Sequence, residues 1–335
     1  MNLENLNNEL KTLPAFRQKQ TYKAIFNELI DDWENATSLP KELRQELNEK
    51  CPLEIKAQIF YSNDKFTAKA LIEFEDGKKV ETVLMRHRDG RNTVCVSTQI
   101  GCPLACEFCA TGQMGFKRNL STLEIAEQVL MFARILKSQD QKVTNIVFMG
   151  MGEPFLNSAN VFAAIKIFKD KNYFNIGSRR ISISTCGIVD GIRELAKKEP
   201  QVNLAISLHA PNDELRSSLM PLNKKYPLKK VLDAVDKYIF DTNRKVMFEY
   251  TLIQEINDSG KQARQLADLL KGRICVVNLV PYNSTGKFTA STPAAIENFK
   301  NILIERGLET SVRHRFGEDI NAACGQLKTS TDVQI

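Results

Sequence analysis

The sequence predicts an α/β protein whose main part is a parallel sheet curved into a partial (β/α)6 barrel. From about residue 93 onward, short β-rich segments alternate with amphipathic helical segments, a pattern typical of parallel strands joined by helical crossovers. The chain before that point has a different pattern, helical up to residue 55 and β-rich over 56–92. We therefore expect a small N-terminal helical accessory domain, then an antiparallel β extension, then the barrel over 93–335.

The composition is that of an ordinary globular chain. Of its 335 residues, 43% are hydrophobic and 26% are charged. No apolar run has the length of a membrane span, and the N-terminus lacks the apolar region of a signal peptide. We expect a cytoplasmic protein without a membrane partner. In such a reducing compartment, eight cysteines are more often metal ligands or reactive groups than a disulfide framework.

Local signals mark several elements. Within the helical part, Ser38 is a candidate N-cap, with Pro40 in the first helical turn. Asp76-Gly77 lies between two alternating segments and predicts a tight hairpin in 56–92. In the barrel region, Ser121 and Glu124 have the spacing of a capping box, and Thr292 is a candidate N-cap. The expected strands are 93–98, 145–150, 180–187, 202–210, 246–253, 274–282 and 309–316. The expected helices are 121–136, 159–169, 189–198, 228–240, 259–272 and 292–307.

Three cysteines lie close together just after the first barrel strand. Cys102, Cys106 and Cys109 are spaced C-x3-C-x2-C in "GCPLACEFCATG", and chemistry in such barrels sits beyond the carboxyl ends of the strands. Structural zinc needs four ligands, and no nearby Cys or His supplies a fourth. A [4Fe–4S] cube held by three thiolates keeps one iron open, and a small molecule with an amine and a carboxylate could chelate that iron.

This cysteine loop resembles that of the radical S-adenosylmethionine (SAM) superfamily. In that superfamily the open iron binds SAM, and reductive cleavage of the sulfonium yields a 5′-deoxyadenosyl radical. A second motif agrees with the resemblance. In "NIVFMGMGEP", residues 145–154, an apolar strand runs into glycines that allow close backbone approach to a ligand. The resemblance implies a radical SAM barrel that holds one [4Fe–4S] cluster per chain.

Seven ordered motifs between Glu81 and Leu327 resemble the RlmN/Cfr family of RNA adenine methyltransferases. They are "CVSTQIGCPLACEFCATG", "GFKRNL", "MGMGEP", "AISLHAPND", "NKKYP", "VNLVPYN" and "DINAACGQL". The resemblance implies methylation of C2 of adenine 2503 in 23S ribosomal RNA, with adenine 37 of certain transfer RNAs as a second target. It also implies that two SAM molecules are consumed per methylation, with an electron donor such as flavodoxin or ferredoxin. We expect the protein to act as a monomer.

The resemblance also implies roles for particular residues. Cys324 would carry a methyl group, lose a hydrogen to the radical and bond to the base. Glu81 would be the general base, and Cys95 would attack the Cys324 sulfur, releasing RNA and leaving a transient disulfide. Cys51, Cys186 and Cys275 match no such role, and we interpret them as structural. The cofactor contacts implied by the family are Gly152, Glu153, Ser184, Ser207, Leu208, His209 and Asn283.

An RNA substrate agrees with the charge of the chain, which is +6. Basic clusters near the predicted active-site loops, among them Lys117-Arg118 and Arg313-His314-Arg315, could neutralise phosphates. The target base would have to leave its stack. Two alternatives remain open. One is the same chemistry at C8 of adenine, as in the antibiotic-resistance branch of the family, although Pro154 favours the C2 branch. The other is a non-catalytic RNA-binding module that contains zinc or a cluster.

Overall fold

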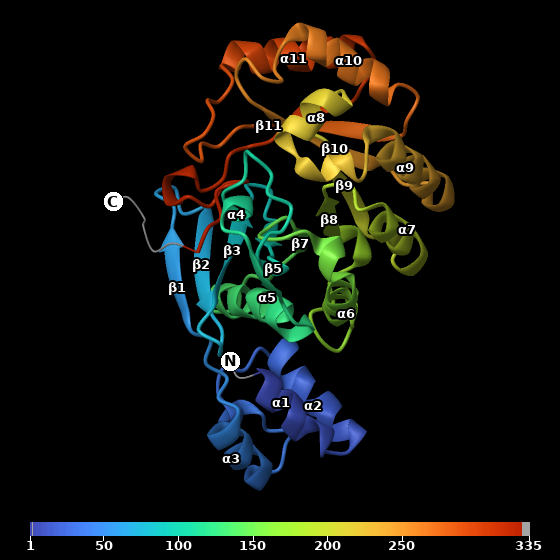
Figure 1. Ribbon diagram of the computed structural model, residues 1–335. Helices are drawn as coiled ribbons and strands as arrows, with labels where there is room; N and C mark the ends of the chain where they lie inside the picture. The colour runs from blue at the N-terminus through green and yellow to red at the C-terminus, as the bar shows by residue number, and fades with distance from the viewer. Residues whose placement is uncertain (2, 330–335) are drawn as a thin grey trace.

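The computed structural model describes residue 1 and residues 3–329. In these residues ten strands form one continuous sheet, in the order β1-β2-β3-β4-β7-β8-β9-β10-β11-β12 (Figure 1). The strands of this sheet are β1 (Ala57–Tyr61), β2 (Thr67–Glu73), β3 (Lys79–Arg86), β4 (Asn92–Cys95), β7 (Asn145–Phe148), β8 (Ile181–Thr185), β9 (Asn203–Ser207), β10 (Val246–Leu252), β11 (Cys275–Pro281) and β12 (Thr310–Val312).

The sheet has an antiparallel part and a parallel part. Strands β1 to β4 pair antiparallel, and the predicted Asp76-Gly77 turn joins β2 to β3, with Gly77 at a φ of 71°. From β4 to β12 all neighbours pair parallel. The predicted α/β class is confirmed, and the β extension continues directly into the barrel sheet. A small separate sheet, absent from the prediction, pairs β5 (Gln99–Gly101) with β6 (Phe116–Asn119).

Helices cover the outer face of the parallel strands. The capping box of Ser121 and Glu124 and the Thr292 N-cap form as predicted. The Ser38 cap is wrong. The helix begins at Lys41, because Pro40 keeps an extended ψ of 150° and itself occupies the cap position. The α-helices are α1 (Leu3–Lys11), α2 (Ala15–Phe26), α3 (Lys41–Lys50), α4 (Ala110–Gln113), α5 (Thr122–Lys137), α6 (Ser158–Lys169), α7 (Val189–Lys198), α8 (Asp213–Leu219), α9 (Leu228–Thr242), α10 (Gly260–Leu270) and α11 (Pro293–Glu305).

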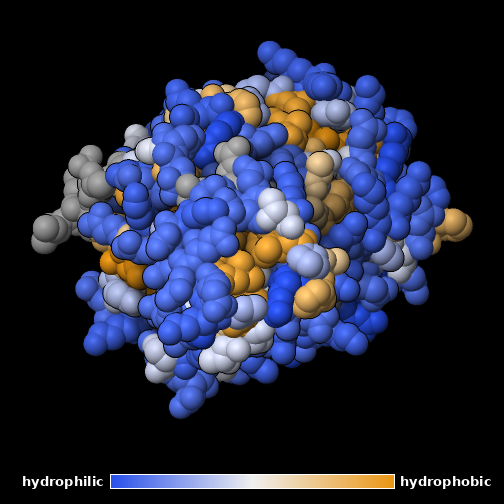
Figure 2. Space-filling view, turned by 90° about the horizontal axis from the view of Figure 1, so that it is seen from below, coloured by the Kyte–Doolittle hydropathy of each residue, from blue (hydrophilic) through white to orange (hydrophobic). Residues whose placement is uncertain are grey.

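The N-terminal helices lie below α5 (Figure 1) and share one hydrophobic core with the barrel. Trp33 is fully buried in this part, and its indole N–H donates to the Cys51 carbonyl. Arg134 of α5 donates to the Leu53 carbonyl at 2.9 Å. Figure 2 shows that the face seen from below is mostly hydrophilic, with separate hydrophobic patches. Among the described residues, no helix combines the length and apolar character needed to span a bilayer.

The chain after β12, residues 313–328, is called here the C-terminal segment. It crosses from β12 to the antiparallel strands and passes beside α4 (Figure 1). The Asp319 carboxylate accepts from the Asn63 N–H at 2.8 Å, and the Asn321 carbonyl accepts from Lys69 at 3.5 Å. The Lys328 N–H donates to Glu81 at 2.8 Å. The segment therefore connects the β12 end of the sheet with the β2–β3 hairpin.

Candidate active site

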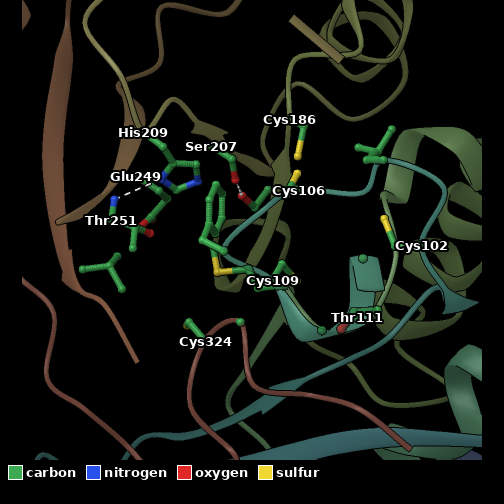
Figure 3. A pocket seen from close by; sticks show the side chains of 18 of the residues that line it. Cys102, Cys106, Cys109, Thr111, Cys186, Ser207, His209, Glu249, Thr251 and Cys324 are labelled. Atoms are coloured by element: carbon green, nitrogen blue, oxygen red, sulfur yellow. Dashed lines mark hydrogen bonds between the residues drawn. The ribbon is translucent and has the colours of Figure 1, made fainter. Parts of the chain in front are cut away.

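A cavity opens at the carboxyl ends of the parallel strands (Figure 3). Its wall is built from the loop after β5, the turns after β7, β8, β9 and β11, and the C-terminal segment. Leu208, also predicted here, is fully buried behind the wall, and its carbonyl accepts from Arg216. The predicted residues that do line the cavity are Cys102, Cys106, Cys109, Gly152, Glu153, Ser184, Ser207, His209, Asn283 and Cys324.

Cys102, Cys106 and Cys109, hereafter the loop cysteines, sit on a tightly folded loop. Gly101 precedes them at a φ of 72°, and a Cβ there would lie 1.7 Å from the Gly115 carbonyl oxygen. Only glycine fits this position without moving the loop. Burial raises the pKa of Cys102 to about 12 and also raises the pKa of Cys109. The free thiols of Cys102 and Cys109 therefore stay protonated, and a metal would release those protons on binding.

The loop cysteines are spread around a common space rather than meeting at one point (Figure 3). In the described part of the chain, no three His, Cys, Asp or Glu side chains converge on a position for a single ion. A tetrahedral zinc ion draws its ligands to one centre. A [4Fe–4S] cube instead presents separate iron corners to its thiolates. The spread of the three thiols fits such a cube.

Glu153 is held rigidly in the turn after β7. Its carboxylate accepts from the Phe155 N–H at 3.1 Å and from the Cys186 N–H at 2.8 Å. The preceding Gly152 has a φ of 98°, and a Cβ there would lie 2.6 Å from the Gln99 side chain. Burial raises the pKa of Glu153, while these two N–H donors lower it. The Gly152–Glu153 turn thus places its backbone and the Glu153 carboxylate at the edge of the cavity.

His209 is fixed in one tautomer. Its Nδ1 accepts from the Thr251 N–H at 3.0 Å, so the proton of the neutral ring is on Nε2. Burial lowers the pKa of His209 to about 3, which keeps the ring neutral. On the same wall, the hydroxyls of Ser184 and Ser207 are 3.2 Å apart. Together these groups offer hydrogen bonds to a polar ligand such as a nucleoside.

Asn283 connects the cavity to the C-terminal segment. Its Nδ2 donates to the Cys324 carbonyl at 3.1 Å. Its Oδ1 is buried and has no hydrogen-bond partner in the described residues. A buried acceptor without a donor is unfavourable, so this atom is suited to receive a hydrogen bond from a bound ligand.

Cys324 and Cys95 line an adjoining cavity, and Cys324 lines both cavities. Cys324 is exposed, whereas Cys95 is buried in β4. Burial, followed by the nearby Cys324, raises the pKa of the Cys95 thiol to about 12, and Arg313 opposes this increase. The Arg313 guanidinium lies 3.8 Å from Glu249 and also contacts the Met149 sulfur. A fixed cation therefore lies where a Cys95 thiolate would need stabilisation.

Glu81 lies outside both cavities, on β3 beneath the C-terminal segment. Its Oε1 is 2.9 Å from the Lys69 ammonium, and its Oε2 accepts from the Lys328 N–H. Both side chains of the ion pair are almost fully buried. Burial raises the pKa of Glu81, and Lys69 is the main opposing influence. In this arrangement the C-terminal segment covers the carboxylate.

Two residues that line the main cavity, Cys186 and Arg313, were not predicted to lie there. Cys186, interpreted as structural, lines the main cavity beside the loop cysteines. Its place two residues after Ser184, just past the end of β8, was the available signal. Arg313 belongs to a cluster that we interpreted as binding RNA phosphates, yet it points into the barrel. Arg118, from another such cluster, is held by Asp76 and Glu124 at 2.8 Å each.

Comparison with known proteins places this fold and site in the class of radical SAM proteins. The sequence model of the Radical SAM superfamily matches residues 96–267. A solved radical SAM methyltransferase from Sphaerobacter thermophilus is 42% identical and superimposes with a TM-score of 0.92, covering 98% of each chain.

Curated relatives identify the family within this class. A probable dual-specificity RNA methyltransferase RlmN from Dictyoglomus turgidum is 43% identical over 317 residues, which is 94% of this chain and 91% of the relative. A protein of the same name from Clostridium botulinum is 43% identical over 320 residues, 94% and 92% of the two chains. The chain belongs to the RlmN/Cfr family, and it is a SAM-dependent radical RNA methyltransferase.

Proposed function

We propose that this enzyme methylates C2 of an adenine in 23S ribosomal RNA, at the position of adenine 2503, and adenine 37 of transfer RNA. The observation that carries the proposal is the place of Cys324, which lines both the cavity of the loop cysteines and the cavity of Cys95. A thiol that must first meet SAM and then meet a second thiol needs such a position. The printed name of the relatives, dual-specificity RNA methyltransferase, supports two kinds of RNA.

The loop cysteines would hold the [4Fe–4S] cluster, and SAM would lie along the Gly152–Glu153 turn. Bound there, the two cofactors supply a 5′-deoxyadenosyl radical. Ser184, Ser207 and the Nε2–H of His209 line the same wall and would position the nucleoside part. The buried Oδ1 of Asn283 would accept a hydrogen bond from it.

Cys324 would first accept a methyl group from one SAM molecule. Loss of a hydrogen atom to the radical from a second SAM would leave a methylene radical on its sulfur, and this radical would add to C2 of adenine. Such a route suits an aromatic C–H carbon, which has no in-plane lone pair to attack a sulfonium methyl. The product of this step is a covalent link between Cys324 and the RNA.

Resolution of the link would use a base and the second thiol. Glu81 would remove the C2 proton, which requires the C-terminal segment to move off its carboxylate. The unpaired electron of the adduct would pass to a one-electron acceptor, a role that the oxidised cluster held by the loop cysteines could fill. Cys95 would then form a disulfide with Cys324 as the bond between the Cys324 sulfur and the methylene carbon breaks, and that carbon takes up a proton. The Arg313 cation would stabilise the Cys95 thiolate that makes this attack.

The mass of the peptide that contains Cys324 tests this proposal. After anaerobic exposure of the cluster-loaded enzyme to SAM, we expect the peptide to gain the mass that a methyl group adds. Turnover with RNA should then consume that methyl group. An active enzyme whose Cys324 stays unmodified would contradict the scheme. Mass spectrometry of the modified nucleosides separates C2 from C8 methylation, and Pro154 favours C2.

A further inference from the structure

Cys186 places a fourth thiol beside the loop cysteines. It follows β8 directly and lines the same cavity. Figure 3 shows its sulfur facing the sulfur of Cys106, and the two thiols are in side-chain contact. The thiol therefore touches one of the three residues that fit the cluster.

The backbone of Cys186 is fixed on both sides. Its N–H donates to the Glu153 carboxylate at 2.8 Å, and its carbonyl accepts from Arg216 at 2.7 Å. Arg216 is fully buried and also donates to the carbonyls of Ser207 and Leu208. These contacts tie Cys186 to the turns after β7 and β9. The Cys186 backbone is therefore held in place beside the cysteine loop.

Gly187 fixes the direction of the chain after Cys186. It has a φ of 104°, and a Cβ there would lie 2.8 Å from the Val231 side chain. Its N–H and the next one both donate to the Thr185 hydroxyl, at 3.1 and 3.2 Å. The turn that presents the thiol is therefore built by several independent contacts.

We propose that Cys186 is a positioning residue of the cluster, whose S–H donates a hydrogen bond to the Cys106 thiolate and favours the reduced state. The inference rests on the proposed cluster at the loop cysteines. Hydrogen bonds to ligating sulfurs are one of the features that set the potential of an iron–sulfur cluster. Reduction adds negative charge to the cluster, so a donor aimed at one ligand stabilises the reduced form more than the oxidised form.

Direct ligation of iron by Cys186 is a different use of the same thiol. The thiolates of a cube bind separate iron corners, whereas Cys186 contacts the Cys106 sulfur itself. The contact between the two sulfurs favours the hydrogen bond. Iron content distinguishes the two uses, because removal of a ligand loosens the cluster and removal of a donor does not.

The test is an EPR-monitored redox titration of the reconstituted enzyme without SAM, with iron and sulfide counted in parallel. We compare Cys186→Ala with Cys186→Ser, which keeps a hydroxyl donor, and with Cys275→Ala, which removes a buried thiol outside the cavity. We expect Cys186→Ala to shift the reduction equilibrium about tenfold toward the oxidised cluster, a fall of about 59 mV for one electron. The Ser variant should recover at least part of the shift, and Cys275→Ala should match the wild type.

An unchanged potential in Cys186→Ala, with a full complement of iron, would overturn this inference alone. Loss of iron from that variant would overturn it too, because Cys186 would then be a ligand. A wild-type protein that never holds four irons would overturn the proposed function together with this inference. The two failures are therefore distinguishable in one set of preparations.

Discussion

The two groups of cysteines in this enzyme are held in contrasting ways. The loop cysteines sit on a compact turn whose shape depends on a glycine that no other residue can replace. Cys324 instead lies exposed on an irregular segment. That segment is docked by separate hydrogen bonds along its length, such as Ala110 N–H to the Gly325 carbonyl and the Thr111 hydroxyl to the Leu327 carbonyl.

This contrast follows the proposed chemistry. A cluster and its cofactor need fixed geometry, which short loops on strand ends supply. A thiol that must accept a methyl group, bond to a base and then bond to a second thiol needs several positions. A segment without helix or strand pairing around its reactive thiol can open locally while the sheet stays folded. The predictions below test each side of this comparison.

The largest effect is expected on the rigid side. Cys106→Ala should remove a cluster ligand and lower RNA methylation at least about a thousandfold, since the site acts as a unit. The measurements are iron per chain and methylated nucleoside per enzyme. Cys51→Ala, a buried cysteine of the N-terminal part, is the matched control. If the Cys106 variant kept both the cluster and RNA methylation, Cys106 could not be a required cluster ligand.

For the reactive thiols of Cys95 and Cys324, we expect the two alanine variants to stop the reaction at different steps. Cys95→Ala should still bond Cys324 to RNA but not release it, so most of the modified RNA should stay attached to protein. Cys324→Ala should form no such adduct. Denaturing gels with labelled RNA distinguish the outcomes. Free methylated RNA from the Cys95 variant at the wild-type rate would count against the assigned order of steps.

The covering of Glu81 by the C-terminal segment can be tested through its ion pair. Lys69→Met leaves a buried carboxylate without its cation, and we expect the free energy of unfolding to fall by about 3–5 kcal/mol at neutral pH. Loss of Lys69 also raises the pKa of Glu81 further, so the effect should shrink as the pH falls. Denaturant titration measures it. The double variant Lys69→Met, Glu81→Gln should recover part of the loss, and no recovery would argue against a direct pair.

The smallest effect concerns His209 on the rigid wall. Burial lowers its pKa from the usual 6.5 to about 3, so in that window the unfolded chain binds a proton that the folded chain does not. Stability should therefore fall with falling pH, by about 1.4 kcal/mol per pH unit from this group. His209→Gln should flatten the slope of unfolding free energy between about pH 6.5 and pH 5. Parallel curves for the wild type and the His209 variant would contradict the burial argument.

The fold could be predicted well because its signals are local. Alternating strands and helices, the capping box at Ser121 and the Asp76-Gly77 turn all depend on near neighbours in the sequence. The loop cysteines were found for the same reason, and the confirmed family supplied the rest of the predicted site. Membership of the family could not show that the C-terminal segment covers Glu81. The hydrogen bond from Lys328 to Glu81 joins residues that are 247 positions apart in the sequence.

Two further features depended on how the sheet curves. Cys186 is 80 residues from Cys106 in the sequence, and only the packing of the turn after β8 against the cysteine loop brings the two thiols together. Arg313 stands among other basic residues, and nothing in the sequence distinguishes the one that points inward. The small β5–β6 sheet was missed because its strands are too short to show alternation.

The C-terminal segment has a consequence beyond docking Cys324. The parallel strands stop at β12, and the antiparallel strands stand on the other side of the opening. The segment spans this opening from Arg313 to Lys328. The segment that closes the side of the barrel thus also carries the reactive thiol of Cys324. If RNA enters through this side, the segment has to move and Cys324 moves away with it. RNA entry and alkylation by Cys324 would then take place one after the other.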